Sequence, residues 1–363
     1  MSPISFIAVH GGAGIHSSKN EKKIKQSLRK YALWSISTSF SSTSLDMVEH
    51  AIMVLEDEEE MNAGYGSNLT LDGTVECDAA IASGCGDYFG SVGAVSGIKN
   101  PIRLARSVLE YSRRPDKLGR VPPLTLVSSG AERFATGNHI ETVSPEALIS
   151  PHAYEVWRKW KQRLESSDKE PLTAGDEESL ADIQDTVGAI AFHEQDGLAS
   201  GVSSGGLLLK YPGRVGEASV FGAGCWANQT QRSSRIMGMA CSVSGTGEHI
   251  VRANFARKLG DALNQFSDKE SNEPPDPHVV LNRALVEFWE SCRERREEVP
   301  SVGVILFTAE DNNEVRLWCA FTTASMAIGY ASSEKPKPKA VILRHPNPHG
   351  GGKPQIYVTS LSI

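Results

Sequence analysis

The sequence predicts one mixed α/β unit, and three observations lead to this prediction. Short apolar runs typical of buried strands occur in both halves of the 363-residue chain, and stretches with helical spacing separate them. The composition is that of an ordinary globular protein, with 40% hydrophobic and 22% charged residues. No internal repeat divides the sequence. We therefore expect one large core rather than two independent domains.

The N-terminal half opens with a predicted strand over residues 6–10. This run ends at Gly11-Gly12-Ala13-Gly14, where glycine allows a sharp turn and a close approach of the backbone to another group. Ser44 is placed to cap a helix. The apolar positions of that helix recur at helical spacing: Val48, Ala51, Ile52 and Leu55.

A loop dense in turn-forming residues follows over 62–68. Further strands are predicted over 75–81 and 90–95. Pro101 stands where a helix can begin, because proline is favoured at the first helical position.

The composition changes between about residues 144 and 182. This segment is polar and charged, and it lacks a sustained apolar spacing after Trp160. A long stretch of this kind within a compact domain is either functional or disordered. We expect a mobile connection here.

The second half carries the strongest strand signals. Strands are predicted over 187–192, 198–202, 239–243, 302–307, 315–320 and 326–331, and helices over 248–263 and 277–293.

Composition also restricts the partners. The net charge of -7 argues against a nucleic-acid or anionic-lipid surface. No apolar run approaches the roughly 20 residues of a membrane span, and the first residues lack the pattern of a secretory signal. The six cysteines include no Cys-x-x-Cys pair, which indicates reduced thiols. We expect a cytoplasmic protein, with import into the nucleus left open.

The pair Asp185-Thr186, at the start of the fourth predicted strand, could carry out chemistry. A threonine here is by itself an ordinary β-branched strand residue. An N-terminal threonine, however, carries its own base, because the α-amine can take the proton of the hydroxyl group. Thr186 acquires such an amine only if the bond after Asp185 breaks. Attack by its hydroxyl on the Asp185 carbonyl would cut the chain.

Several motifs resemble, in their order along the chain, the plant-type asparaginase group of N-terminal nucleophile hydrolases, and most closely its threonine aspartase branch. They are His10-Gly11-Gly12-Ala13-Gly14, Asn62-Ala63-Gly64-Tyr65-Gly66-Ser67, Glu76-Cys77-Asp78-Ala79, Asp185-Thr186-Val187-Gly188, Gly213-Arg214-Val215-Gly216 and Ser244-Gly245-Thr246-Gly247-Glu248-His249. The resemblance implies an α/β (α+β) fold of four layers, in which helices lie on either side of two packed sheets.

The resemblance also implies roles for individual residues. Thr186 would be the nucleophile, Ser204 would hold its new amine, and Ser244 with the backbone amide of Gly245 would stabilise the tetrahedral oxyanion. The remaining residues of the implied site are Asn62, Gly11, Gly12 and Gly247, which line the nucleophile and the substrate.

Arg214 would anchor the carboxylate of the substrate, a task that suits a planar guanidinium. Asparaginases carry an aspartate three residues later for the ammonium group of asparagine, and this chain has Glu217 there. They also have glycine before the threonine, whereas Asp185 resembles the threonine aspartases. In a peptide cut after aspartate, the attacked carbonyl lies two carbons from the carboxylate, as it does in asparagine.

Two other motif matches fail in context. Residues 201–205 fit the nucleophile-elbow pattern of α/β-hydrolases, but a helix should follow the serine, and the chain soon reaches Pro212. Neither a Walker loop nor a dinucleotide fingerprint is complete.

Our prediction is a threonine endopeptidase that cleaves peptides after aspartate. It would cut itself into residues 1–185 and 186–363, which remain together as an αβ heterodimer, and two such heterodimers could pair. No cofactor is expected, although relatives hold sodium in the region of Asn62. The first alternative is an L-asparaginase and isoaspartyl peptidase; the second is a binding module that no longer processes.

Overall fold

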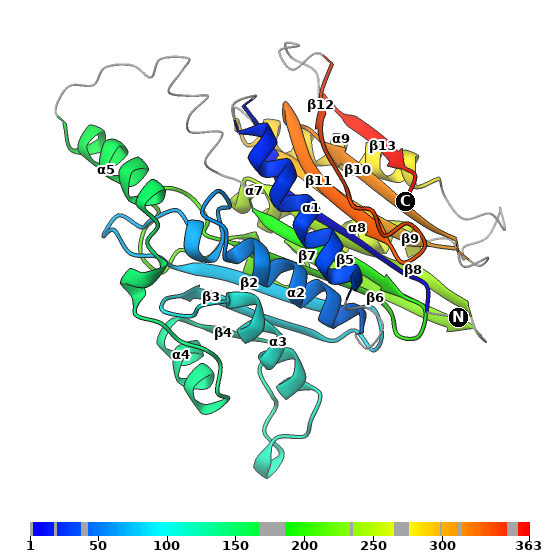
Figure 1. The fold of residues 1–363 in the computed structure, drawn as a ribbon, viewed down its shortest axis with the longest axis horizontal. Coiled ribbons are helices and arrows are strands. Elements are labelled where there is room, and N and C mark those ends of the chain that lie inside the picture. Colours follow the sequence, from blue (N-terminus) through cyan, green and yellow to red (C-terminus); the bar gives the residue numbers. More distant parts are fainter. Residues whose placement is uncertain are drawn as a thin grey trace.

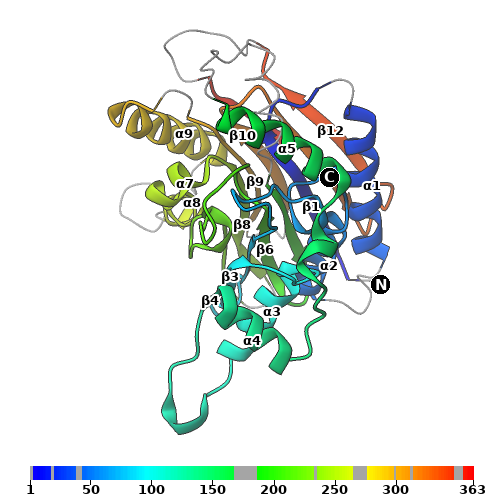
Figure 2. The ribbon, with the colours of Figure 1, turned by 90° about the vertical axis from the view of Figure 1, so that its left-hand side faces the viewer.

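The computed structural model describes residues 3–17, 20–37, 43–166, 186–232, 235–264, 276–297, 300–310, 314–346 and 355–363. Two sheets lie face to face at its centre, and helices cover the outer face of each sheet (Figures 1 and 2). The four-layer sandwich implied by the sequence motifs is confirmed.

The larger sheet places the start of β5 at its centre. In spatial order its eight strands are β12 (Lys339–Arg344), β11 (Ser325–Ser332), β1 (Ser5–Gly14), β5 (Val187–His193), β6 (Gly197–Ser204), β2 (Cys77–Ser83), β3 (Phe89–Val95) and β4 (Thr125–Val127). Strand β5 pairs with β1 on one side and with β6 on the other, antiparallel to both. Strands from both sides of the Asp185-Thr186 bond are therefore interleaved in one sheet.

The smaller sheet packs over β1, β5 and β6. Its five strands are β13 (Tyr357–Leu361), β10 (Val315–Phe321), β9 (Val302–Ala309), β8 (Arg235–Gly245) and β7 (Cys225–Arg232). Fully buried side chains from the two sheets, such as Ile190, Val202, Ile305 and Phe307, form one cluster between them. Burial of this apolar surface is the main force that holds the sheets together.

Helices complete the sandwich. The helices α1 (Glu21–Ser37), α2 (Ser44–Glu56) and α3 (Pro101–Ser112) pack on the eight-stranded sheet, and α8 (Phe255–Asn264) and α9 (Pro277–Glu294) pack on the five-stranded one. The described residues also include α4 (Ser128–Gly137), α5 (Pro151–Glu165) and α7 (Gly247–Ala253). None of the described helices is long and apolar enough to span a bilayer.

Most predicted elements are confirmed within a few residues, but two helix boundaries were wrong. The cap of α2 is Thr43 rather than Ser44, because the Thr43 side chain accepts from Asp46 N and the Asp46 side chain accepts from Thr43 N. The helix expected over 248–263 is two helices. Asn254 adopts a left-handed conformation with φ 46° and ends α7.

The expectation of a mobile connection over 144–182 was wrong for its first part. Residues 151–165 form α5, where the Ser150 side chain accepts from Ala153 N and Pro151 occupies the first turn. Trp160 is buried, and Trp157 donates from Nε1 to Thr70 O at 2.8 Å. Aromatic contacts thus fix a helix whose average composition is polar. Residues 167–182 lie outside the described part of the chain.

The elements that sequence reasoning missed are mostly amphipathic or short. They include α1, β4, β7, β12 and β13. The cysteines agree with the prediction of reduced thiols, since all six are free and only Cys85 is exposed.

Glu56, at the end of α2, is a fully buried carboxyl group. Its Oε1 accepts from Ile102 N at 3.0 Å and from Ser203 Oγ at 2.7 Å, and burial raises its pKa to about 8. The folded protein therefore retains a proton that the unfolded chain releases near its ordinary pKa of 4.5. Stability from this group is complete below that value and is lost as the pH rises toward 8.

We expect Glu56→Gln to remove this pH dependence. Between pH 5 and 8, the free energy of unfolding of the wild type should fall relative to that of the variant by up to about 4 kcal/mol. Urea unfolding at several pH values measures the difference. Glu146→Gln is the control, because Glu146 is exposed. Parallel pH profiles of wild type and Glu56→Gln would contradict the prediction.

Candidate active site

Thr186 immediately precedes β5 and is buried, with 2% of its surface exposed. Side chains alternate between the two faces of a strand. On β5, Ile190 belongs to the core between the sheets, so Thr186 and Gly188 share that inner face. The hydroxyl oxygen of Thr186 contacts two groups. It lies 3.1 Å from Ser204 Oγ and donates to Glu217 Oε1 at 2.9 Å.

Strand pairing explains why Ser204 reaches Thr186. Strands β5 and β6 are antiparallel with Val187 opposite Ser203, so the end of β6 lies beside the start of β5. Ser204 Oγ also accepts from Gly206 N at 3.0 Å, which fixes the turn after β6. Ser204 therefore lies beside the Thr186 hydroxyl in the uncut chain, and its role toward the amine of the cut chain stays a prediction.

Asn62 stabilises the turn after β6 through hydrogen bonds to its backbone. Its Nδ2 donates to Gly206 O at 2.9 Å, and its backbone oxygen accepts from Gly205 N at 2.8 Å. Its Oδ1 accepts from Asn68 N at 2.9 Å. Among the described contacts, Asn62 therefore holds Ser204 in place rather than touching Thr186 directly.

Ser244 and Gly245 end β8 on the opposite sheet. Ser244 is buried and shares the inner face of β8 with Ser242. Its Oγ accepts from Ala13 N at 3.1 Å, at the irregularity of β1 that contains Gly11 and Gly12. Gly12 has φ 100° and Gly245 has φ 144°, conformations that other residues rarely adopt. The two predicted glycine segments thus meet across the sheets.

Arg214 is already paired in this structure. Its Nε and Nη2 donate to the two carboxylate oxygens of Glu248, each at 2.8 Å. Glycines leave room for the guanidinium. A Cβ atom at Gly247 would lie 2.7 Å from Arg214 Nη2 and 2.5 Å from Glu217 Oε2. Gly247 therefore leaves room for Arg214 and Glu217 to approach each other.

Glu217 is the ionisable side chain that contacts the Thr186 hydroxyl. It is 3% exposed, and burial raises its pKa to about 7, although the neighbouring Arg214 acts in the opposite direction. A carboxyl group with this pKa exchanges its proton near neutral pH. The sequence motifs gave Glu217 only a role toward the substrate, whereas the structure places it on the hydroxyl of Thr186.

Sequence reasoning assigned no role to three other residues of this region. Asp78 on β2 accepts from Ala94 N at 2.8 Å and from Gly216 N at 2.7 Å, and so positions the loop of Arg214. Glu248 pairs with that arginine. His10 is fully buried and lies 2.9 Å from Ser242 Oγ, and burial lowers its pKa to about 3. In the sequence, Asp78, Glu248 and His10 stood out only because they belong to the motifs quoted above.

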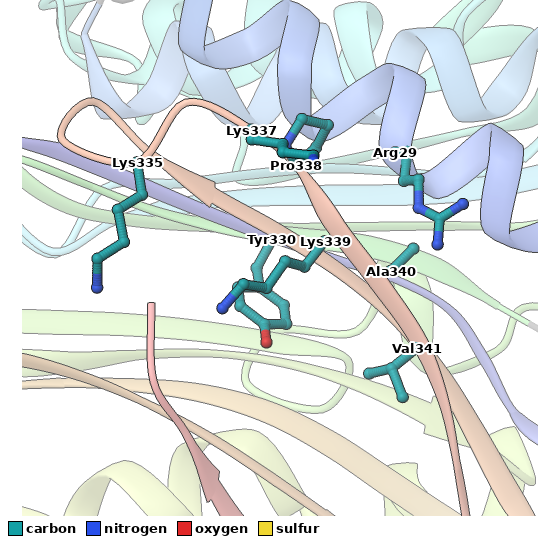
Figure 3. A pocket seen from close by; sticks show the side chains of 8 residues that line it. All are labelled: Arg29, Tyr330, Lys335, Lys337, Pro338, Lys339, Ala340 and Val341. Atoms are coloured by element: carbon teal, nitrogen blue, oxygen red, sulfur yellow. The ribbon is translucent and has the colours of Figure 1, made fainter.

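Asp185, the predicted residue before the cut, lies outside the described residues. A surface pocket elsewhere, between α1 and strands β11 and β12, contains none of the Thr186 cluster (Figure 3). Its lining is basic and includes Arg29, Lys335, Lys337 and Lys339. This pocket is therefore separate from the Thr186 cluster.

The cluster suits nucleophilic attack on an acyl group. It combines a buried hydroxyl with a proton acceptor, and the guanidinium of Arg214 lies near that acceptor. Ser244 and Gly245 lie on the facing sheet.

Comparisons with known proteins agree with this chemistry. Residues 3–273 match the sequence profile of a family described as asparaginase. The chain is 34% identical to a plant-type L-asparaginase of Pyrococcus horikoshii over 93% of this chain and 99% of that protein. It is 35% identical to an isoaspartyl peptidase/L-asparaginase of Bos taurus over 71% of this chain and 75% of that protein. It is also 35% identical to an isoaspartyl peptidase of Escherichia coli over 69% and 74% of the two chains.

Proposed function

Because this chain belongs to the asparaginase family, and is thus a hydrolase, we propose that it is a self-processing threonine hydrolase of the L-asparaginase and isoaspartyl peptidase type. The observation that carries the proposal is the contact of Thr186 Oγ1 with both Ser204 and Glu217, at the start of a central strand. The threonine endopeptidase predicted from the sequence becomes the second candidate, because the matching family and relatives are described as asparaginases and isoaspartyl peptidases.

In the proposed mature enzyme, the free amine of Thr186 takes the proton of its own hydroxyl group. The oxygen then attacks the substrate carbonyl, and Ser244 with the amide of Gly245 stabilises the resulting oxyanion. The bond from the attacked carbon to the substrate nitrogen then breaks, and ammonia or an amine leaves with the proton held by the Thr186 amine. The resulting acyl ester on Thr186 is hydrolysed by water. Neither step requires a metal or an organic cofactor.

Arg214 is the proposed site for the carboxylate of the substrate. Its guanidinium is bound by Glu248, whose side chain is 46% exposed, so one edge of the ion pair faces solvent. A substrate carboxylate can join or replace Glu248 there. Glu217 lies beside Arg214, and its carboxylate form suits the ammonium group of asparagine or of an isoaspartyl dipeptide.

Processing would produce two chains that cannot easily part. Strand β5 would belong to one chain, yet it pairs with β1 of the other. Similarly, β2 pairs with β6 across the cut. We propose that residues 1–185 and 186–363 stay together as an αβ heterodimer.

A structural sodium ion near Asn62 also forms part of the proposal. A Cβ atom at Gly66 would lie 2.1 Å from Met61 O, 2.6 Å from Glu59 O and 2.7 Å from Glu58 O. Several backbone oxygens therefore gather in one loop, and oxygen atoms are the ligands that hard cations prefer. An ion held by them would stiffen the loop that carries Asn62.

A second candidate function is cleavage of peptides after aspartate. The observation that favours it is Asp185 itself, because self-processing at this position already cuts a bond after aspartate. An internal aspartate presents its carboxylate to Arg214 at the same two-carbon distance from the attacked carbonyl as asparagine does.

Three substrates separate the two candidates. The processed enzyme is incubated with asparagine, with a β-aspartyl dipeptide and with a longer peptide that contains one internal Asp-Gly bond. We expect release of ammonia or aspartate from the small substrates. Cleavage of only the longer peptide would replace our proposal with the endopeptidase. If no substrate is turned over and intact mass shows a single full-length chain, both hydrolase proposals fail and a binding module remains.

A further inference from the structure

Self-cleavage requires a base that the mature mechanism does not supply. Before the cut, the nitrogen of Thr186 is part of the Asp185-Thr186 amide and cannot accept the proton of the hydroxyl group. A threonine hydroxyl is a poor nucleophile unless its proton is removed as it attacks. The uncut chain must therefore provide another acceptor within hydrogen-bond reach of Thr186 Oγ1.

Among the described residues, two side chains contact that oxygen. Ser204 is a neutral hydroxyl, 3.1 Å away, and is too weak a base. The other is the carboxyl group of Glu217, which accepts from Thr186 Oγ1 at 2.9 Å. We propose that Glu217 is the general base of self-cleavage and takes the proton of the Thr186 hydroxyl as its oxygen attacks the carbonyl carbon of Asp185.

Two other titratable groups nearby are less suitable. His10 lies at the inner face of β5, where a Cβ atom at Gly188 would be 2.5 Å from His10 Nε2. That ring nitrogen is bound to Ser242 Oγ instead of Thr186 Oγ1, and its low pKa makes it a weak base. Asp78 is occupied by two backbone amides.

The surroundings of Glu217 favour proton exchange near neutral pH. Burial disfavours its charged form, and the Asp78 carboxyl acts in the same direction, whereas the Arg214 guanidinium favours the charged form. Glu248 also forms an ion pair with Arg214, so the positive charge of the guanidinium acts on two carboxyl groups. The opposing effects leave the pKa of Glu217 at about 7, so that a large fraction is ready to accept a proton at physiological pH.

Self-cleavage in this scheme needs no reagent other than water. The bond between Thr186 Oγ1 and the Asp185 carbonyl carbon forms, and the bond from that carbon to the Thr186 nitrogen breaks. The proton on Glu217 passes to this nitrogen, which leaves as the free amine. Water then hydrolyses the ester, which restores the Thr186 hydroxyl and leaves a carboxyl group on Asp185.

This inference rests on the proposed function only in that Thr186 must cut its own chain. It gives Glu217 two successive tasks, first as a base in the precursor and then as a partner for the substrate ammonium group. The first task predicts a defect in processing that is independent of any added substrate.

The test follows processing of the full chain in time. Wild type and variants are labelled with a short pulse of methionine in cell-free translation and diluted into buffers from pH 5 to 9, and the two fragments are quantified on gels. For the wild type, the rate constant should rise about tenfold per pH unit below 7 and then level off. Glu217→Gln should process at least about 100-fold more slowly and lose this slope. Glu217→Asp should retain the slope at an intermediate rate.

Glu56→Gln is the matched control, because it also neutralises a buried glutamate but one without contact to Thr186. It should process within about twofold of the wild-type rate. If circular dichroism shows that Glu217→Gln is unfolded, Glu217→Asp decides instead. A pH slope retained in this variant supports the inference, and a lost slope contradicts it. Wild-type rates in Glu217→Gln, with Thr186→Ala still uncut, would overturn this inference alone. A wild-type chain that never cuts would overturn both it and the proposed function.

Discussion

Thr186→Ala is expected to remain a single 363-residue chain without hydrolase activity. The substitution removes the hydroxyl oxygen that contacts both Ser204 and Glu217, so neither self-cleavage nor attack on a substrate has a nucleophile. Loss of a catalytic nucleophile typically costs at least about 10⁴-fold in turnover. Intact mass and N-terminal sequencing after prolonged incubation measure the first effect, and release of ammonia from asparagine measures the second.

Thr186→Ser is the matched control, because serine keeps the hydroxyl group and loses only a methyl group. It should process and turn over substrate at reduced rates. Two fragments from Thr186→Ala, with a new N-terminus at residue 186, would exclude the hydroxyl-first scheme. Active material whose second chain begins elsewhere would exclude Thr186 as the nucleophile.

Arg214→Ala is expected to have the next largest effect. It removes the guanidinium proposed to hold the carboxylate beside the attacked carbonyl and leaves Glu248 without its bidentate partner. Truncation of one partner in such a charge pair costs about 2 to 5 kcal/mol, so kcat/KM for acidic substrates should fall by about 30- to 5000-fold. The selectivity for acidic over neutral substrates should disappear.

Arg214→Lys separates charge from geometry, since lysine keeps the positive charge but cannot bind a carboxylate through two parallel hydrogen bonds. Its kcat/KM should lie between those of the wild type and of Arg214→Ala. Parallel kinetics with a β-aspartyl dipeptide and with its β-alanyl counterpart, which lacks the α-carboxylate, measure the selectivity. Unchanged selectivity in Arg214→Ala would move the carboxylate site elsewhere in the molecule.

Much of the fold was predictable because strands and helices leave local periodic signals. The runs that begin at Val187 and Val302 are buried along their whole length, and each became a strand close to its predicted bounds. Failures occurred where a few side chains outweigh average composition. In α5, the cap at Ser150 and the indole groups of Trp157 and Trp160 order a polar segment.

Part of the site was equally predictable. Thr186 and Ser204 lie at the ends of neighbouring strands, and alternation along β5 and β6 sends both side chains to the inner face. Once the strands are paired, their contact follows. The motifs around Asn62 and Ser244 pointed to two segments, one behind the turn after Ser204 and one on the facing sheet, but they did not predict the hydrogen bonds of these residues.

The sequence alone determined the strand pattern, the inner-facing positions and the place of Thr186 at a strand start, because each depends on residues that are neighbours along the chain. Only the tertiary structure brought Glu217 to Thr186 and Glu248 to Arg214, at separations of 31 and 34 residues. Such contacts join loops without periodicity. Their geometry is set by how two sheets and the glycines between them pack, and no local signal encodes that packing.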